Sequence, residues 1–317
     1  MIVLYYTDKF IEPDELFCDG TFLYAPQLPE VPQRNIQLYR IFGLIHETVI
    51  VPCFTIIMQK KTEDEYKIVF EAIADIVGRW RLAARIAHFD GETAAVNAFK
   101  SIRKFRRIKC KMCSFHVRQC LHRHGATLGL TRDYGEEKNQ FIKHFTTSIG
   151  GLQHAPTGIL DEAVTALNDF LNGQHAIDQA VIEKLQYLLN EYFVPTWLEH
   201  SLGIEFVSAA DVTTNCTNNY AETFHGNQKL FYKQPHAKLG QFLFDDRRLQ
   251  NCLETEIKLM ESGDHDIPEK NDDGDRKRAS TRARMMNQLA VANVNRGEII
   301  LKYVHRLGKY AGMAGEF

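Results

Sequence analysis

Three extended apolar segments precede the first helical pattern in this chain of 317 residues. They run from Leu16 to Tyr24, from Ile36 to Ile45 and from Thr48 to Met58, and the short link between the last two suits a hairpin. The next segment, from Lys61 to Trp80, has apolar residues at the 3.6-residue period of an amphipathic helix. The order therefore predicts an α/β domain whose sheet begins with three antiparallel strands.

Two further strand patterns follow, each after a helical pattern. The apolar run from Leu82 to Phe89 predicts a buried strand, Glu92 to Phe105 a helix, and Arg107 to Met112 a short strand. The expected order is βββαβαβ, and right-handed crossovers between the helix-linked strands would give a mixed sheet with helices on its faces. In that sheet the strand that ends before Asp90 can lie beside the first strand, so Asp19 and Asp90 can meet.

The later part of the chain has a different pattern. From Asp133 to about His200 it is helical, and after Met260 an acidic, turn-rich stretch is followed by the basic stretch RKRASTRAR. We expect a short helix from about Met285 onward. The expected parts are a first part of the core (1–125), an all-helical insertion (126–210), a core completion with a glutamate-bearing helix (211–260), and a linker with a basic C-terminal tail (261–317).

Composition excludes several classes of protein. Hydrophobic residues make up 44% and charged residues 25% of the chain, as in ordinary globular proteins. No apolar stretch reaches the length of a membrane span, and the first residues lack the basic start and apolar core of a signal peptide. We therefore expect an intracellular chain without a membrane partner, in which the seven cysteines are reduced.

One stretch is strongly basic although the net charge of the chain is only -2. From Thr93 to Arg132 there is no acidic residue, while lysines and arginines recur throughout. Such a surface can hold a phosphate backbone, and the alternative is a solvated helix face followed by a loop. The candidate DNA contacts are Lys100, Arg103, Lys104, Arg106, Arg107, Lys109 and Lys111.

The pair Asp19-Gly20 interrupts the first strand pattern and has two interpretations. An Asp-Gly pair between apolar runs is a strong signal for a tight hairpin turn. The alternative is a single strand with a carboxylate in its middle, which would be there for chemistry because aspartate is depleted in strands. Together with Asp90 and Glu222, such a carboxylate could hold two divalent cations that cleave or join a phosphodiester.

Four motifs, in order along the chain, resemble those of the transposases of Mutator-like elements. The resemblance covers roughly Leu16 to Leu230, and the ordered set is more specific than any one motif. The motifs are CDGTF with Asp19, FDGETA with Asp90 and Glu92, CSFH with Cys113 and His116, and NNYAETFH with Asn218, Asn219, Glu222 and His225.

The resemblance implies a ribonuclease H-like fold with an all-helical insertion before the last catalytic helix, and a DDE-type active site. It assigns Asp19, Asp90 and Glu222 as catalytic residues and as ligands of two Mg²⁺ or Mn²⁺ ions, with the other motif residues in support. It also implies cleavage and transfer of double-stranded DNA in the nucleus, by a homo-oligomer when the protein is active. It favours the strand interpretation of Asp19 over the hairpin.

One departure from the family concerns the start of the chain. Mutator-like transposases usually carry an N-terminal module that recognises the element's ends, and only 18 residues precede Asp19. We therefore expect the target-recognition module to be missing from this chain. Two other functions stay open: a catalytically silent, transposase-derived protein that binds DNA or chromatin, and a nuclease of the same fold that acts without strand transfer.

Each acidic residue also has a purely structural interpretation. Asp90 could be the N-cap of the helix that follows it. Glu222 stands three residues after Asn219, which is the spacing of a capping box. Glu92 near the start of a helix is favoured by the helix dipole alone, so we expect it to support the site rather than to bind metal.

Cysteines and histidines cluster after the last expected strand. Cys110, Cys113 and His116 have the C-x-x-C-x-x-H spacing that suggests a structural zinc ion. If Cys113, His116, Cys120 and His124 lie on one helix, however, they form a single stripe, and four ligands on one straight helix cannot surround one ion tetrahedrally. We prefer a hydrogen-bonded His116 that orients the active-site region, with structural zinc as the alternative.

Overall fold

The computed structural model describes residues 3–6, 13–77, 83–212, 224, 227–269, 273–292 and 294–312. The chain divides into two compact units, and each unit contains two separate stretches of sequence. The first unit comprises Met1–Cys110 and Thr217–Lys270, and the second comprises Lys111–Cys216 and Asn271–Phe317. The division falls inside a strand, so the segment expected as the first part of the core (1–125) is shared between the two units.

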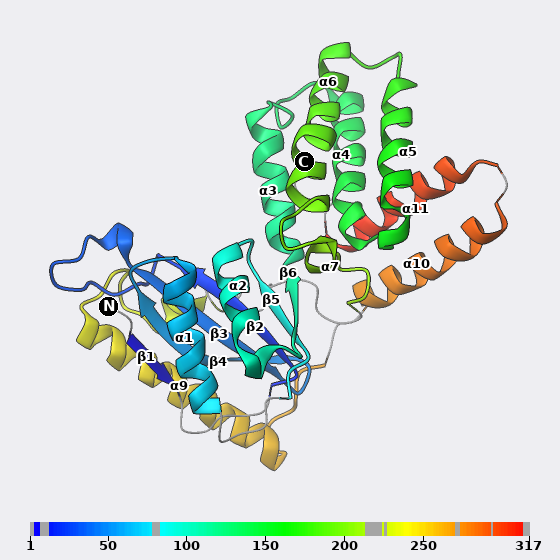
Figure 1. The fold of residues 1–317 in the computed structure, drawn as a ribbon. Helices are drawn as coiled ribbons and strands as arrows, with labels where there is room; N and C mark the ends of the chain where they lie inside the picture. The colour runs from blue at the N-terminus through cyan, green and yellow to red at the C-terminus, as the bar shows by residue number, and fades with distance from the viewer. Residues whose placement is uncertain are drawn as a thin grey trace. The chain divides into compact units, whose positions relative to one another are not determined.

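The first unit is an α/β structure built on an open, mixed sheet (Figure 1). Its strands follow the order β1-β4-β3-β2-β5-β6, in which β2 pairs antiparallel with β3 and parallel with β5. The expected order βββαβαβ is present from β2 onward, and β1 is an additional short edge strand that pairs with β4. The strands are β1 (Val3–Tyr6), β2 (Glu15–Thr21), β3 (Gln37–Ile45), β4 (Val49–Met58), β5 (Ile86–Phe89) and β6 (Lys109–Met112).

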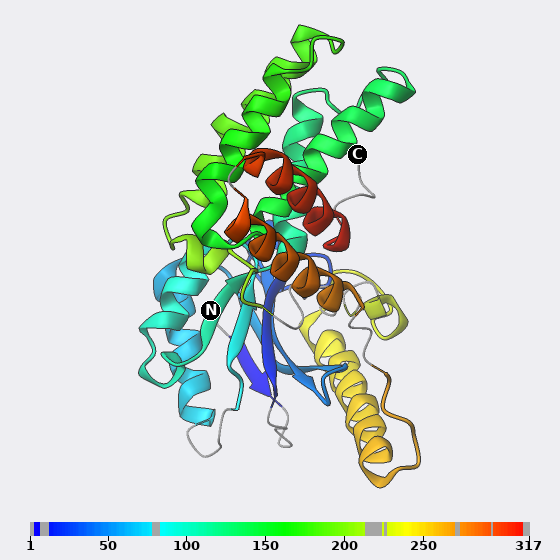
Figure 2. The same ribbon diagram turned by 90° about the vertical axis from the view of Figure 1, so that its right-hand side faces the viewer.

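Helices cover both faces of this sheet (Figure 2). Consecutive residues of a strand point to opposite faces, and Tyr39 and Arg40 on β3 show which helix covers which face. The ring of Tyr39 packs against Tyr66, with ring centroids 5.0 Å apart, whereas Arg40 forms an ion pair with Asp246. Tyr66 lies on α1 (Glu63–Ile76), which packs beside α2 (Thr93–Ser101), and Asp246 lies on α9 (Leu239–Ser262).

The Asp19-Gly20 pair lies inside β2, so the hairpin interpretation is wrong. β2 is one continuous strand, and its backbone pairs with β3 through Thr21. Gly20 leaves room for the Gln37 side chain, because a Cβ atom at this position would lie 1.9 Å from Nε2 of Gln37, which would then have to move. Tertiary packing thus outweighs the local turn preference of Asp-Gly.

The second unit is helical, apart from the end of β6. Its apolar helix faces meet in a core to which Phe145, Leu185 and Phe193 contribute fully buried side chains. Among the helices of the described residues in either unit, none is both long and apolar enough to cross a membrane. The helices are α3 (Ser114–Thr127), α4 (Glu136–Gly151), α5 (Leu160–Asn172), α6 (Gln179–Tyr187), the π-helical η6 (Leu188–Leu198), α7 (Ile204–Val207), α10 (Asp273–Val291) and α11 (Arg296–Tyr310).

The C-terminal part differs from the expected linker and basic tail (261–317). Two helices, α10 and α11, occupy most of it, and α11 packs against α4 and α5. The buried residues of α10 have helical spacing, but Arg278 and Thr281 take the first two positions before Met285 and Leu289. The first half of the helix therefore shows no apolar stripe in the sequence. The charges are paired locally, since Asp273 bonds to Lys277 one turn later and the Arg278 guanidinium donates to Asp275.

Two glycines allow α11 to approach α4 closely. A Cβ atom at Gly308 would lie 2.0 Å from the carbonyl oxygen of Thr147, and one at Gly151 would lie 2.0 Å from the carbonyl oxygen of Val304. These oxygens belong to helix backbones and cannot rotate away, so any side chain here would push the two helices apart.

We predict that Gly308→Ala destabilises the second unit by about 2 kcal/mol or more, because relieving the clash requires separation of α11 from α4. The matched control is Gly297→Ala on the same helix, where the added Cβ would make an ordinary contact 3.7 Å from Ala166. Urea unfolding measures both variants. Equal stability of Gly308→Ala and Gly297→Ala would show that the close helix contact is absent.

Candidate active site

The structure brings Asp19 and Asp90 together at neighbouring strands. Asp19 is the fifth residue of β2, and the preceding residue, Cys18, pairs in parallel register with Phe89, the last residue of β5. Asp90 follows Phe89 directly, so the two carboxylates occupy equivalent positions on adjacent strands. Parallel pairing of the two strands thus joins residues that are 71 positions apart in the sequence.

Asp90 has a strongly perturbed carboxyl group. Burial, the neighbouring charge of Asp19 and that of Glu92 raise the pKa of Asp90 to about 7, against smaller opposing effects of the Glu92 backbone N–H and of Lys61. A buried carboxyl group that stands beside other carboxylates is harder to ionise in the absence of a cation. Near neutral pH, Asp90 therefore holds a proton for part of the time.

Asp90 does not cap the helix that follows it. The N-cap of α2 is Glu92, and the Oδ1 atom of Asp90 accepts a hydrogen bond from the Glu92 backbone N–H over 3.3 Å. The N-cap interpretation of Asp90 is therefore wrong, and its carboxylate lies in a turn between β5 and α2. Glu92 does not use its side chain as a cap either.

The Glu92 carboxylate is held in place by two side chains. Its Oε2 atom accepts a hydrogen bond from the Tyr66 hydroxyl over 2.6 Å and lies 3.5 Å from Nζ of Lys61. Tyr66 is buried on α1, and burial together with the charge of Glu92 raises the pKa of its hydroxyl, so it remains a donor. Glu92 thus stands two positions after Asp90 with an oriented carboxylate.

A buried cation lies next to Asp19 on the same face of the sheet. Arg40 on β3 is the cross-strand partner of Asp19 and is 0% exposed. Its Nη2 atom donates to Oδ1 of Asp246 and to the Tyr232 hydroxyl, each over 2.6 Å, and the Tyr232 hydroxyl also bonds to Asp246. The guanidinium lies over the ring of Phe224, 5.4 Å from its centroid. Asp19 therefore lies on a strand next to a fixed, buried Arg40–Asp246 ion pair.

The fourth motif, NNYAETFH, lies mostly outside the described residues. This applies to Asn218, Asn219, Glu222 and His225, whereas Phe224 is described. Phe224 packs edge to face on Phe42, with ring centroids 5.0 Å apart, and also contacts the buried cluster formed by Phe17, Phe42 and Leu44. These residues lie on the sheet face that carries Arg40.

Cys113 and His116 belong to the second unit. Cys113 is the buried N-cap residue of α3, and His116 lies one turn into the helix, where its ring contacts Phe115. Further along α3, His124 stacks on Tyr192, with ring centroids 3.8 Å apart. In the described part of the chain, no group of three or more His, Cys, Asp or Glu side chains is placed to hold a metal ion.

The basic segment is divided by the structure. Six of its candidate DNA contacts are exposed, and they lie at the C-terminal end of α2 and in the segment after it. Glu92 lies at the other end of α2, a helix of nine residues that is about 13 Å long. Arg103 and Lys104 share a hollow of about 490 Å³ with Glu71 and Asp75 of α1. Acidic residues of another segment thus lie close to part of the basic segment. The exposed candidates are Lys100, Arg103, Lys104, Arg106, Arg107 and Lys109.

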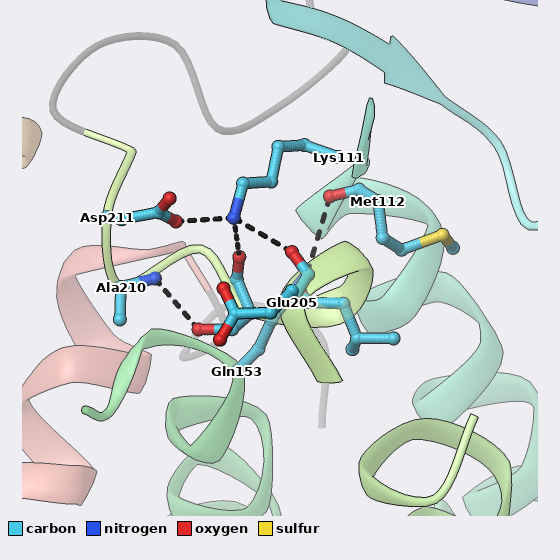
Figure 3. A network of polar contacts seen from close by, with 8 residues as sticks. Lys111, Met112, Gln153, Glu205, Ala210 and Asp211 are labelled. Carbon is cyan, nitrogen blue, oxygen red and sulfur yellow. Dashed lines mark hydrogen bonds and ion pairs between the residues drawn. The ribbon is translucent and has the colours of Figure 1, made fainter. Parts of the chain in front are cut away.

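Lys111 is not part of this surface. It is 3% exposed, and its ammonium donates to the carbonyl oxygens of Glu205, over 2.9 Å, and Ser208, over 3.0 Å, and to the Asp211 carboxylate (Figure 3). Nearby, Gln153 donates to the carbonyl oxygen of Val207 over 3.0 Å. The expected role of Lys111 in DNA contact is therefore replaced by a structural one, in which it fixes the segment after α7.

Several residues around the carboxylates gave no signal in the sequence. Tyr66 fits the apolar stripe of a helix, and Lys61 stands in an unremarkable charged stretch before it. Arg40 is a single cation in a run of nine buried strand residues, which is unusual enough to indicate a buried partner. The sequence does not indicate that this partner is Asp246, because 206 positions separate them.

Comparison of the chain with models of protein families, with curated proteins and with solved structures gave no match.

We predict that Asp90→Asn changes how stability depends on pH in the absence of divalent cations. In the unfolded chain Asp90 ionises above about pH 4, whereas in the folded protein its pKa is about 7. Folding is therefore favoured by this group at low pH, and that contribution is lost as the pH rises to 7 and above. Asp90→Asn has no carboxyl group at this position and does not suffer the loss. The melting temperature of the variant, minus that of the wild type, should therefore rise by about 3 °C or more from pH 4 to pH 8.

The control for this measurement is Asp266→Asn, which changes an exposed carboxylate in a loop of the same unit. Its melting temperature should follow that of the wild type at every pH. A constant difference between Asp90→Asn and wild type across the pH range would contradict the raised pKa.

A second prediction separates Lys111 from its exposed neighbour. Lys111→Met leaves two carbonyl groups and a carboxylate without their donor, so it should destabilise the second unit by about 2 kcal/mol or more. Lys109→Met changes an exposed side chain at the start of β6 and should cost much less. Urea unfolding compares the two, and equal losses would argue against the buried lysine network.

Proposed function

We propose that this chain is the catalytic part of a DDE-type transposase, which cleaves DNA strands and joins a DNA 3′-hydroxyl to a target phosphodiester. The observation that carries the proposal is the placement of Asp19 and Asp90 at equivalent positions on adjacent strands, where burial and the charge of Asp19 raise the pKa of Asp90. Burial of two neighbouring carboxylates costs free energy and does not stabilise the fold by itself. Such a pair at the ends of adjacent strands is typical of a functional site, where a bound cation offsets the repulsion.

The fold supports this proposal through the order of its elements. Three antiparallel strands are followed by two helix-linked strands, and β2, which carries Asp19, lies between β3 and β5 inside the sheet. A ribonuclease H-like fold is proposed on this order together with the motifs that resemble Mutator-like transposases. The helices of the second unit begin at Ser114, directly after β6, and those from α4 to α7 fall within the segment 126–210 expected as a helical insertion.

Mg²⁺ or Mn²⁺ fits the two aspartates chemically. Both side chains offer oxygen atoms, which hard divalent cations prefer, and a bound cation would relieve the repulsion that raises the pKa of Asp90. When bound, a pair of such ions activates the attacking oxygen and stabilises the leaving oxygen of a phosphodiester. Asp19 and Asp90 would hold the ions, while Tyr66 keeps the Glu92 carboxylate oriented beside them.

We propose Glu222 as the third carboxylate. Phe224, two positions later, packs on Phe42 and lies over Arg40, the cross-strand partner of Asp19. Phe224 is the described residue of the NNYAETFH motif, and it lies on the sheet face that carries Arg40. The assignment of Glu222 itself rests on the motif that resembles Mutator-like transposases.

DNA is the proposed partner. The exposed cations after α2, among them Arg106, Arg107 and Lys109, suit the phosphate backbone and would bind it without reading its sequence. These cations do not depend on the carboxylates. They therefore favour a second candidate as well, a catalytically silent protein derived from a transposase that binds DNA or chromatin.

Nicking of supercoiled plasmid DNA in Mg²⁺ or Mn²⁺ separates the two candidates. The wild type should nick, and Asp19→Asn, Asp90→Asn and Glu222→Gln should each lower the rate roughly 100-fold or more, because each loses a charge that positions the ions. Asp266→Asn, which alters an exposed loop, should retain the wild-type rate.

Three results would count against these assignments. If the wild type binds DNA but does not nick it, the protein is the catalytically silent DNA-binding candidate. Nicking that survives in Asp19→Asn or Asp90→Asn contradicts the active site as a whole. Nicking that survives in Glu222→Gln alone removes Glu222 from the site and leaves the aspartates in place.

A further inference from the structure

An exposed aromatic ring lies at the end of the strand that carries Asp19. Phe22 follows β2 directly and is 46% exposed, only three positions after Asp19. Single exposed apolar side chains are common on protein surfaces and need no explanation by themselves. Phe22 differs from such residues because a lysine beside it connects it to the acidic site.

Lys61 connects the ring to the acidic site. Its Nζ atom lies 4.9 Å from the centre of the Phe22 ring and 3.5 Å from Oε2 of Glu92. Lys61 stands just before Thr62, which caps α1 by accepting a hydrogen bond from the Glu65 backbone N–H over 3.4 Å. The lysine is therefore held at a fixed point of the backbone, between the ring and the carboxylates.

We propose that Phe22 and Lys61 form a subsite for one unpaired nucleotide of a DNA substrate, with its base on the Phe22 ring and its phosphate at Lys61. This inference rests on the proposed function, since it assumes that the carboxylates act on DNA. A base with a free face gains stacking energy on an aromatic side chain, and a lysine ammonium is a point charge that suits a phosphate.

The position of the two residues favours an unpaired base over a duplex. Inside a duplex both faces of a base are already stacked, so a single protruding ring cannot engage one without unstacking it. At a strand end or a frayed end one face is free. The subsite would therefore place the end of a DNA strand beside Asp19, Asp90 and Glu92, where Lys61 offsets part of their repulsion of the phosphate.

The alternative occupant is a protein. Leu23, next to Phe22, is 56% exposed, and the two side chains together are apolar enough to dock against another chain. A protein-docking patch has no need of a lysine that links the ring to a group of carboxylates. A nucleotide is therefore the occupant that accounts for both the aromatic ring and the lysine beside it.

The test compares two DNA ligands of the same sequence, a blunt duplex and a duplex with a single-stranded tail that carries 2-aminopurine. Binding is measured by fluorescence anisotropy in EDTA, so metal-dependent cleavage plays no part. Phe22→Ala should weaken binding of the tailed duplex about tenfold and leave the blunt duplex nearly unchanged. Phe22→Trp should retain the preference for the tail, and the wild type should quench 2-aminopurine more than Phe22→Ala does.

The matched control is Phe244→Ala, which removes another exposed phenylalanine, 63% exposed on α9 of the same unit. It should bind both ligands as the wild type does. Lys61→Met should weaken the tailed duplex selectively, whereas Lys61→Arg should restore most of the loss.

The proposal is overturned if Phe22→Ala binds the tailed duplex as tightly as the wild type, or if it loses both ligands equally. Loss of self-association in Phe22→Ala without any change in tail binding would assign the patch to protein contact. Because the readout is binding in EDTA, it is independent of nicking. A protein that nicks plasmid DNA but shows no tail effect keeps its proposed function and loses the subsite, and the reverse result keeps the subsite alone.

Discussion

The buried ion pair between Arg40 and Asp246 is the constraint on which the first unit depends. An arginine in the middle of β3 with no solvent contact must be neutralised inside the protein, and removal of one partner from such a pair costs roughly 3–5 kcal/mol. The carboxylate that neutralises it comes from α9, which follows the helical insertion in the sequence. The sheet is therefore complete only when a late segment of the chain returns to it. The same contact fixes the surroundings of Asp19, the cross-strand partner of Arg40.

The two faces of the sheet differ in the side chains that they carry. On one face Tyr39 joins an aromatic cluster with Tyr66 and Phe70 of α1, which is ordinary apolar packing. On the other face the strands carry polar side chains that contact one another, including His88 and Glu15 at 2.8 Å, beside the apolar cluster of Phe17, Phe42 and Leu44. Buried charges persist only when they are paired or hydrogen-bonded, which is the role of the Arg40–Asp246 pair on this face. Asp90, with its raised pKa, is the carboxyl group whose compensation is incomplete.

Much of this arrangement was open to prediction from the sequence, and the parts that were not have physical reasons. The strand order and the meeting of Asp19 with Asp90 follow from apolar patterns and from the parallel pairing of helix-linked strands. The burial of Lys111 did not follow, because a lysine in a basic stretch gives no sign that carbonyl groups some 95 positions later surround it. The helix α10 was hidden by a stripe in which arginine and threonine take the place of apolar residues. Long-range polar partners, unlike apolar periodicity, leave no local pattern.

The central claim is that Asp19 and Asp90 form a pair of carboxylates that a divalent cation completes. The most direct measurement is an NMR titration of the Asp90 side-chain carboxyl carbon, with and without Mg²⁺. In the absence of the cation the pKa should be about 7, and Mg²⁺ should lower it by about one unit or more, because a bound cation favours the ionised form. A pKa near 4 without Mg²⁺, or one that Mg²⁺ leaves unchanged, would contradict the account.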